Sequence, residues 1–298
     1  SIMWTKCFVL CTTYVSLVAS FSRVLNYECG NAPLKGLRGC NPRTSNRIIN
    51  GVRVERGEIP WQISIVIGVN TTYTTTFECG GTIISDFYVL TVGHCLDSFN
   101  ISGIIHYPDP CKSNIYAGDI QRKAGVSYPV SKFILHPSYK RIALGMLNDI
   151  GLVKIVGPFQ FNALIQPVCL PLYGNETNKR ESVIVGSGWG VNSIQQISGS
   201  YHLMRTDLKV QNMSNNVCKD DIFHCADPSS YLCTFNPPSS GCYGDSGSPA
   251  TLEVNGRCIL VGVFSSGTRC GETSFLTNVS YYLKWIDQHI QETSLTTC

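Results

Sequence analysis

The chain has 298 residues, of which 43% are hydrophobic and 14% charged, a composition that argues against disorder and predicts a packed globular body. Its formal net charge is +3, but six Lys or Arg and only one acid fall within residues 1–47. The remaining residues carry 17 basic and 19 acidic side chains, which gives no reason to expect a nucleic acid or an anionic membrane as a partner.

Residues 1–20 predict a secretory signal peptide. Lys6 precedes an apolar run from Cys7 to Val18, and the residues up to Ser20 offer a cleavage site. A run this short does not comfortably span a bilayer, so a membrane anchor is the weaker alternative. We therefore expect a secreted, extracellular protein that has no membrane partner.

The cysteines indicate the same route. Fifteen cysteines without a C-x-x-C pair favour disulfides formed in an oxidising compartment over a zinc or redox site. Five N-x-[ST] triplets support secretion more weakly, at Asn70, Asn100, Asn175, Asn212 and Asn278.

Residues 21–47 predict a pro-segment and residues 48–298 the main domain. The first stretch is rich in Gly and Pro and poor in large apolar residues, so it cannot form a core alone. After it, short β-rich runs at 61–67, 82–84, 182–185 and 259–264 predict an all-β barrel or sandwich. Helical spacing is confined to the tail, where one face carries Tyr281, Tyr282, Trp285, Ile286 and Ile290.

Three short motifs carry the residue types of nucleophilic catalysis. Thr91-Val92-Gly93-His94-Cys95 places a histidine beside a cysteine that can lock its loop. Asn148-Asp149 precedes an apolar strand, where a buried carboxylate needs a cationic partner such as an imidazolium. Gly244-Asp245-Ser246-Gly247 would be only a Gly-rich turn by itself, but a serine hydroxyl with a base and oxyanion donors becomes a nucleophile.

In this order and at these separations the motifs resemble the chymotrypsin/trypsin-like serine peptidase family, over about residues 47–290. The resemblance implies the trypsin-like serine protease fold, in which two six-stranded antiparallel β-barrels pack together with a C-terminal α-helix. It implies Ser246 as nucleophile, His94 as general acid–base and Asp149 as the buried acid that fixes the histidine tautomer. The backbone N–H groups of Gly244 and Ser246 would form the oxyanion hole. Two neighbours depart from the family pattern, namely Val92-Gly93 before the histidine and Ser248 after Gly247.

Arg47-Ile48-Ile49-Asn50-Gly51 resembles the family's activation junction. Cleavage after Arg47 would free the α-ammonium group of Ile48 to pair with Asp245, and this ion pair would shape the oxyanion hole. A buried carboxylate without a counter-charge is costly. The partners implied are protein or peptide substrates, an activating trypsin-like protease and serpin-type or other protein inhibitors.

The resemblance also implies a disulfide framework. It pairs Cys79 with Cys95, Cys218 with Cys233, and Cys242 with Cys270. It also pairs Cys169 with either Cys29 or Cys40, a bridge that would keep the pro-segment attached after cleavage. The partner of Cys258 stays open, and one thiol should be free or intermolecular because an odd number remains. The loop 119–123 lacks the spaced acids that a hard cation needs, so we expect no metal, and no cofactor is implied.

Specificity is predicted from the same resemblance. Ser240 would form the floor of the primary pocket, Ser265-Ser266-Gly267 one wall, and Ser274 would fall near the opposite wall. A neutral floor disfavours substrates with Lys or Arg before the scissile bond. If Ser274 points inward the pocket is shallow, and if it points away aromatic side chains fit. A chymotrypsin-like preference therefore ranks above an elastase-like one, and both rank above a trypsin-like one.

Two other function classes compete with a secreted serine endopeptidase. This fold also serves as catalytically inactive homologues that act as binding or regulatory proteins, but those commonly lack a triad residue and this chain has all three. A lipase or esterase of the α/β-hydrolase type would carry its residues in the order Ser, Asp, His. The order here is His, Asp, Ser.

Overall fold

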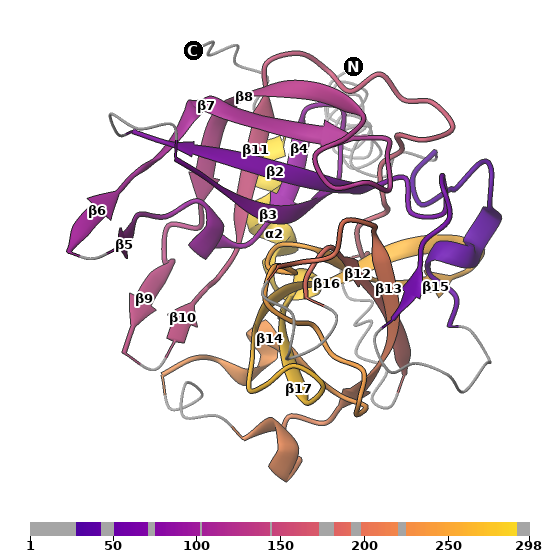
Figure 1. The fold of residues 1–298 in the computed structure, drawn as a ribbon. Coiled ribbons are helices and arrows are strands. Elements are labelled where there is room, and N and C mark those ends of the chain that lie inside the picture. The colour runs from indigo at the N-terminus through magenta and orange to yellow at the C-terminus, as the bar shows by residue number, and fades with distance from the viewer. Residues whose placement is uncertain are drawn as a thin grey trace, which may run out of the picture.

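The computed structural model describes residues 28–42, 51–70, 75–101, 103–143, 145–172, 182–191, 198–219 and 225–290. Two β-barrels lie one above the other in this view and make up most of the molecule (Figure 1). The predicted signal peptide and the predicted cleavage site at Arg47 and Ile48 lie outside the described residues. In the part of the chain that is described, no helix is long and apolar enough to cross a membrane.

The first barrel is closed, with the strand order β11-β4-β3-β2-β7-β8 and antiparallel pairing throughout. Alternation along β2 explains its place, because Ile63, Ile65 and Ile67 are fully buried in the core. Gln62, on the opposite face of β2, is also buried and contacts residues of the second barrel. The strands are β2 (Gln62–Val69), β3 (Thr76–Ile83), β4 (Tyr88–Thr91), β7 (Pro108–Ala117), β8 (Val126–Leu135) and β11 (Gly151–Ile155).

The second barrel has the order β1-β13-β12-β15-β16-β17-β14. A further pairing between β13 and β14 closes six of these strands into a ring, with the two-residue β1 added at β13. The two-barrel fold predicted from the sequence is therefore confirmed, and the sandwich alternative is wrong. The strands are β1 (Val52–Arg53), β12 (Val183–Gly188), β13 (Met204–Gln211), β14 (Tyr231–Phe235), β15 (Pro249–Val254), β16 (Arg257–Gly267) and β17 (Thr273–Asn278).

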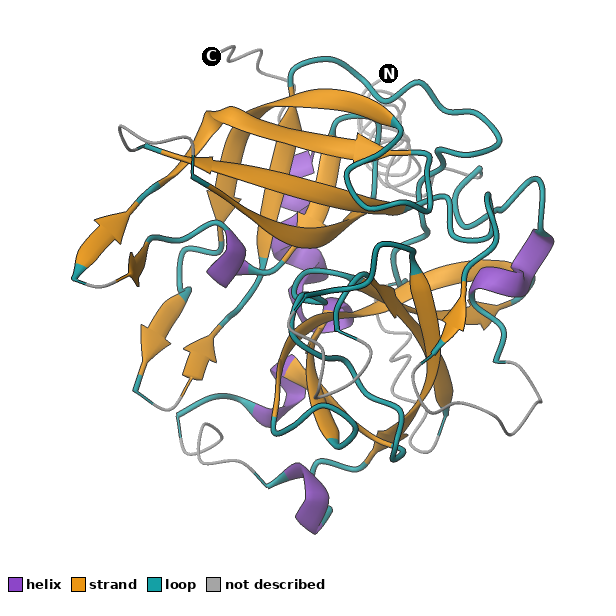
Figure 2. Cartoon of the chain, viewed as in Figure 1, coloured by secondary structure: helices purple, strands orange, loops and turns teal. Residues whose placement is uncertain are grey.

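Two short hairpins project from the first barrel on the same side of the molecule (Figure 1). They are β5 (Phe99–Ile101) with β6 (Ile104–His106), and β9 (Lys140–Ile142) with β10 (Gly145–Leu147). Short 3-10 helices occupy several connections between strands (Figure 2). They are η1 (Gly36–Gly39), η2 (Gly93–Cys95), η3 (Asn216–Cys218), η5 (Pro228–Ser230) and η6 (Val279–Tyr282).

The predicted C-terminal helix is present as α2 (Leu283–Ile290) and packs back on the first barrel. Its Trp285 ring contacts His136, which follows β8, with ring centroids 5.2 Å apart. Tyr282, Trp285 and Ile286 are buried as expected, but Tyr281 is 45% exposed. The sequence pattern placed Tyr281 on the buried face wrongly, because it belongs to the 3-10 helix η6, whose rotation per residue differs from that of an α-helix.

Candidate active site

His94 and Asp149 are brought together by the pairing of two strands. His94 lies in η2, directly after β4, and Asp149 lies two residues before β11. Strands β4 and β11 pair with Thr91 opposite Gly151, so the two side chains meet at the end of this ladder. The Asp149 Oδ2 atom lies 2.8 Å from His94 Nδ1, and the backbone N–H of His94 donates to Oδ1 at 2.8 Å.

Asp149 is completely buried and also accepts from the second barrel. The Ser265 hydroxyl donates to Oδ2 at 2.6 Å, and the Thr277 hydroxyl donates to the backbone carbonyl at 2.6 Å. Burial alone would raise the pKa of Asp149, but the charge of His94 and the hydrogen bonds from His94 and Ser265 hold that pKa below its ordinary value. The ionised carboxylate can only accept, so Nδ1 carries the proton and Nε2 keeps its lone pair for an incoming proton.

Ser246 lies in a turn between two glycines with positive φ, Gly244 at 96° and Gly247 at 82°. The Ser246 carbonyl accepts from Gly80 N at 2.8 Å, and Gly247 N donates to the Phe264 carbonyl at 2.9 Å. A Cβ on Gly247 would overlap the Gly80 carbonyl and Thr91, so only glycine allows this close approach to β3. The turn thus holds Ser246 between the two barrels.

Asp245 is partly buried as a residue, and its carboxylate oxygens pack against the backbone of Gly188 and Gly190. It accepts from the backbone N–H of Gly190 at 2.7 Å and from that of Cys242 at 2.9 Å. A Cβ on Gly188 or Gly190 would overlap the carboxylate oxygens, so these glycines make room for it. Burial raises the pKa of Asp245 to about 6, which the two backbone N–H groups only partly offset. Among the described residues no cationic group lies within 4.0 Å of this carboxylate.

A pocket of about 270 Å³ opens beside Ser246. Ser265, Ser266 and Gly267 line it, as expected for a wall. The lining residues do not include Ser240 and Ser274, the expected floor and opposite wall. The Ser240 hydroxyl donates to the Gly241 carbonyl at 2.8 Å and accepts from Gly271 N at 2.5 Å, while the Ser274 hydroxyl accepts from Gly241 N at 2.9 Å. Both hydroxyls are therefore occupied by the backbone that encloses the pocket.

The charge of this pocket was not anticipated from the sequence. Arg269 is the one charged residue among those that line it, and its side chain is exposed. The remaining lining residues are Gly241, Cys242, Tyr243, Phe264, Thr268 and Cys270. The cysteine beside Arg269 gave a signal that could have been used, because the expected bridge from Cys242 to Cys270 places residue 269 next to the nucleophile loop.

The two residues that depart from the family pattern, Gly93 and Ser248, each make a defined contact in the structure. A Cβ on Gly93 would overlap the ring of Tyr139, so a bulky neighbour fills the space that an alanine would use. Ser248 is fully buried, and its hydroxyl accepts from Gln62 Nε2 at 3.3 Å. Gln62 in turn accepts from the Ser187 hydroxyl at 2.7 Å. This polar link between the barrels was missed, because it joins residues 186 positions apart in the sequence.

The structure contains five disulfides among the described residues. They are Cys29–Cys169, Cys40–Cys258, Cys79–Cys95, Cys218–Cys233 and Cys242–Cys270. The first resolves the open choice for Cys169, and the second supplies the partner of Cys258. Cys111 is also disulfide-bonded, Cys225 is a free and exposed thiol, and Cys298 lies outside the described residues.

The loop 119–123 carries two cationic side chains, Arg122 and Lys123, which pair with Glu78. Arg122 Nε lies 3.5 Å and Lys123 Nζ lies 2.7 Å from the carboxylate oxygens of Glu78. Across the described ranges, no group of three or more His, Cys, Asp or Glu side chains could hold a metal ion.

Comparison with known proteins agrees with this arrangement, because the family model described as Trypsin matches residues 48–286. The chain belongs to the trypsin family. It is 29% identical over 305 residues to phenoloxidase-activating factor 3 of Holotrichia diomphalia, covering 92% of this chain and 83% of that protein. It is 28% identical over 280 residues to the serine proteinase stubble of Drosophila melanogaster, covering 89% of this chain and 33% of that protein. It is 26% identical over 280 residues to CLIP domain-containing serine protease B4 of Anopheles gambiae, covering 88% of this chain and 75% of that protein.

As a member of the trypsin family the protein is a serine endopeptidase, a hydrolase that acts on protein substrates. The match begins at residue 48, so it covers the two barrels and leaves out the predicted pro-segment.

Proposed function

We propose that this protein is secreted as a zymogen and that Ser246, His94 and Asp149 act as its catalytic triad. The observation that carries the proposal is the buried Asp149, which accepts from both His94 and Ser265. Ser265 lines the same pocket as Ser246, which supports Ser246 as the hydroxyl that the His94–Asp149 pair activates.

In this mechanism Nε2 of His94 takes the proton of the Ser246 hydroxyl as Oγ attacks the substrate carbonyl carbon. The imidazolium that forms is stabilised by the ionised Asp149, 2.8 Å from Nδ1. The backbone N–H groups of Gly244 and Ser246 donate to the oxyanion. His94 then passes the proton to the leaving amine, and a water molecule activated by the same histidine hydrolyses the acyl-enzyme.

We propose further that the active form arises by cleavage between Arg47 and Ile48. The buried carboxylate of Asp245 supports this step, because its raised pKa reflects a charge that lacks a cationic partner among the described residues. The new α-ammonium group of Ile48 would supply that partner and hold the nucleophile turn in place.

For specificity we propose a neutral, apolar residue before the scissile bond, with a chymotrypsin-like preference ranked above an elastase-like one. The pocket contains no acidic residue among its lining, and its one charge is the cation of Arg269. A substrate Lys or Arg would therefore lose its hydration and meet a like charge.

The test is covalent labelling of Ser246 by a fluorophosphonate, before and after limited trypsin treatment, with N-terminal sequencing of the product. We expect labelling only after a new chain begins at Ile48, and no labelling of Ser246→Ala. Cleaved protein that resists the probe would favour the alternative, an inactive homologue that serves as a binding protein. Values of kcat/KM for matched peptides with Phe, Leu, Ala or Arg at the cleaved position then test the specificity. The highest kcat/KM for the Arg peptide would contradict the proposed preference.

A further inference from the structure

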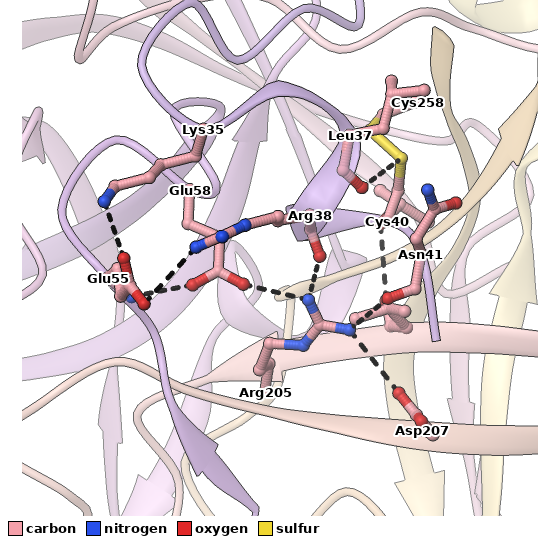
Figure 3. Close-up of polar contacts among 12 residues, drawn as sticks. Lys35, Leu37, Arg38, Cys40, Asn41, Glu55, Glu58, Arg205, Asp207 and Cys258 are labelled. Atoms are coloured by element: carbon pink, nitrogen blue, oxygen red, sulfur yellow. Dashed lines mark hydrogen bonds and ion pairs between the residues drawn. A yellow bond between two sulfur atoms is a disulfide. The ribbon is translucent and has the colours of Figure 1, made fainter. Parts of the chain in front are cut away.

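A buried arginine outside the active site binds the pro-segment. Arg205, on β13, has a side chain that is 1% exposed. Its Nη1 donates to the carbonyl of Arg38 and to Oε1 of Glu58 at 3.0 Å, and its Nη2 donates to the carbonyl of Asn41 at 2.6 Å (Figure 3). Asp207 lies 3.6 Å from Nη2. Two acceptors of this buried cation are therefore backbone carbonyls of the segment 28–42.

The segment is seated by its backbone. A Cβ on Gly39 would overlap the backbone of Glu58, and one on Gly30 would overlap the carbonyl of Cys258. Gly30 N donates to the Pro167 carbonyl at 2.8 Å, and Cys258 N donates to the Gly30 carbonyl at 3.0 Å. The side chains contribute less, because Lys35 and Arg38 form ion pairs with Glu55 at partly exposed positions.

Without this segment the guanidinium of Arg205 would lose two acceptors in a buried place. An unsatisfied buried cation is strongly unfavourable, since Glu58 alone cannot accept from all of its donors. The segment 28–42 therefore supplies hydrogen-bond acceptors that the second barrel lacks. Its two disulfides, Cys29–Cys169 and Cys40–Cys258, hold these carbonyls beside Arg205.

Arg205 is also connected to the nucleophile turn. In β13 it pairs with Val52 of β1, the strand that follows the predicted cleavage site, and with Ser187 of β12. Strand β12 ends at Gly188, and Gly190 just beyond it donates to Asp245 at 2.7 Å. Arg205 therefore contacts the segment 28–42 through its side chain and pairs with strands β1 and β12 through its backbone. Strand β1 follows the predicted Ile48 terminus, and β12 leads to the residue that binds Asp245.

We infer that Arg205 is a positioning residue, which couples the docking of the disulfide-tethered segment 28–42 to the Asp245 side of the oxyanion hole. This inference rests on the proposed activation at Ile48. The segment then acts as a structural subunit of the enzyme, and its loss lowers catalysis although it lies away from the substrate.

The experiment compares cleaved wild type with Arg205→Met, Arg205→Lys and Arg38→Ala. It measures kcat and KM separately, and the rate at which cyanate modifies the Ile48 amine. Arg205→Met removes the charge and the donors, whereas Arg205→Lys keeps the charge but cannot reach both carbonyls and Glu58 together. Arg38→Ala is the matched control, because it keeps the carbonyl that Arg205 binds and removes only a partly exposed ion pair.

We expect Arg205→Met to lower kcat about tenfold with KM changed less than about twofold, because only about a tenth of the molecules would hold Ile48 inserted. Modification of Ile48 should quicken in parallel, Arg205→Lys should fall between, and Arg38→Ala should match the parent. If Arg205→Met does not fold, Arg205→Lys decides. Parental kcat and parental Ile48 reactivity in Arg205→Lys would overturn the coupling. Failure of the proposed activation is a separate result, because it appears in the parent itself as cleavage elsewhere or as no activity after cleavage.

Discussion

The carboxylate of Asp245 makes the stability of the uncut protein depend on pH in an unusual direction. Burial raises its pKa from an ordinary 3.8 to about 6, so the folded protein binds this proton more tightly than the unfolded chain does. The contribution to stability is therefore fully present below about pH 3.8 and is lost as the pH rises through about 6. Most buried carboxylates that are paired with a cation show the opposite trend.

The size of the effect follows from the pKa change. A pKa raised from 3.8 to about 6 corresponds to about 3 kcal/mol in the free energy of unfolding, an upper value because Asp245 is partly exposed as a residue. For a domain of this size that is on the order of 6–12 °C in the thermal midpoint. After cleavage the Ile48 ammonium should pair with the carboxylate and lower its pKa. The cleaved protein should then not lose stability as the pH rises.

The assay is calorimetry between pH 4 and 7 on Ser246→Ala, which prevents autolysis, with Ser246→Ala/Asp245→Asn as the matched reference. Asparagine keeps one acceptor for the backbone N–H groups, and whatever it costs does not depend on pH. In the uncut state the midpoint of Ser246→Ala should fall relative to the reference as the pH rises, and in the cut state it should not. Parallel curves for both uncut proteins would refute the assignment of an unpaired buried charge to Asp245.

Three further outcomes are expected. Asp149→Asn should lower kcat by about 10³–10⁴ with little change in KM, since an amide facing His94 Nδ1 reverses the tautomer; a loss below tenfold would contradict the triad. Arg269→Gln should raise kcat/KM for an Arg substrate about two- to fivefold, and the gain should shrink in high salt because Arg269 is exposed. As the control, kcat/KM for a Leu substrate should stay the same. Peptide mass spectrometry of the secreted protein should find a glycan at the exposed Asn212 and none at Asn278, which is 4% exposed and donates to the Ser229 carbonyl; a modified Asn278 would show that folding does not protect it.

The two-barrel fold could be predicted because its signals are local or belong to whole motifs. The alternating Ile63, Ile65 and Ile67 define a strand, and the motif around His94 resembles a family whose fold is known. The error at Tyr281 arose at an element boundary, where a helical pattern read from the sequence does not distinguish a 3-10 turn from an α-helix. Local pattern therefore determined which strands form, while the exact ends of elements depended on the packing.

Ser265 shows why the site could be only partly predicted. As a residue of the pocket wall it lies where the resemblance implied, yet its hydroxyl donates to Asp149, 116 positions away. Nothing near Ser265 in the sequence distinguishes a wall residue from a partner of the buried acid. The pocket charge at Arg269 is a similar case, because its effect depends on the loop that brings it beside Ser246.

Arg205 gave no signal in the sequence, since a single arginine within a strand is usually exposed. Its burial is compensated by hydrogen-bond acceptors from Glu58 and from the segment 28–42, and the Asp207 carboxylate lies 3.6 Å away. If Arg205 depends on the carbonyls of Arg38 and Asn41 as proposed, the segment 28–42 must be present whenever the barrel is folded. The same two disulfides that keep the segment attached therefore also protect a buried ion pair, so the covalent and electrostatic links serve one purpose. Cleavage at Arg47 would then free only the chain that begins at Ile48, and the remainder of the pro-segment would stay as part of the enzyme.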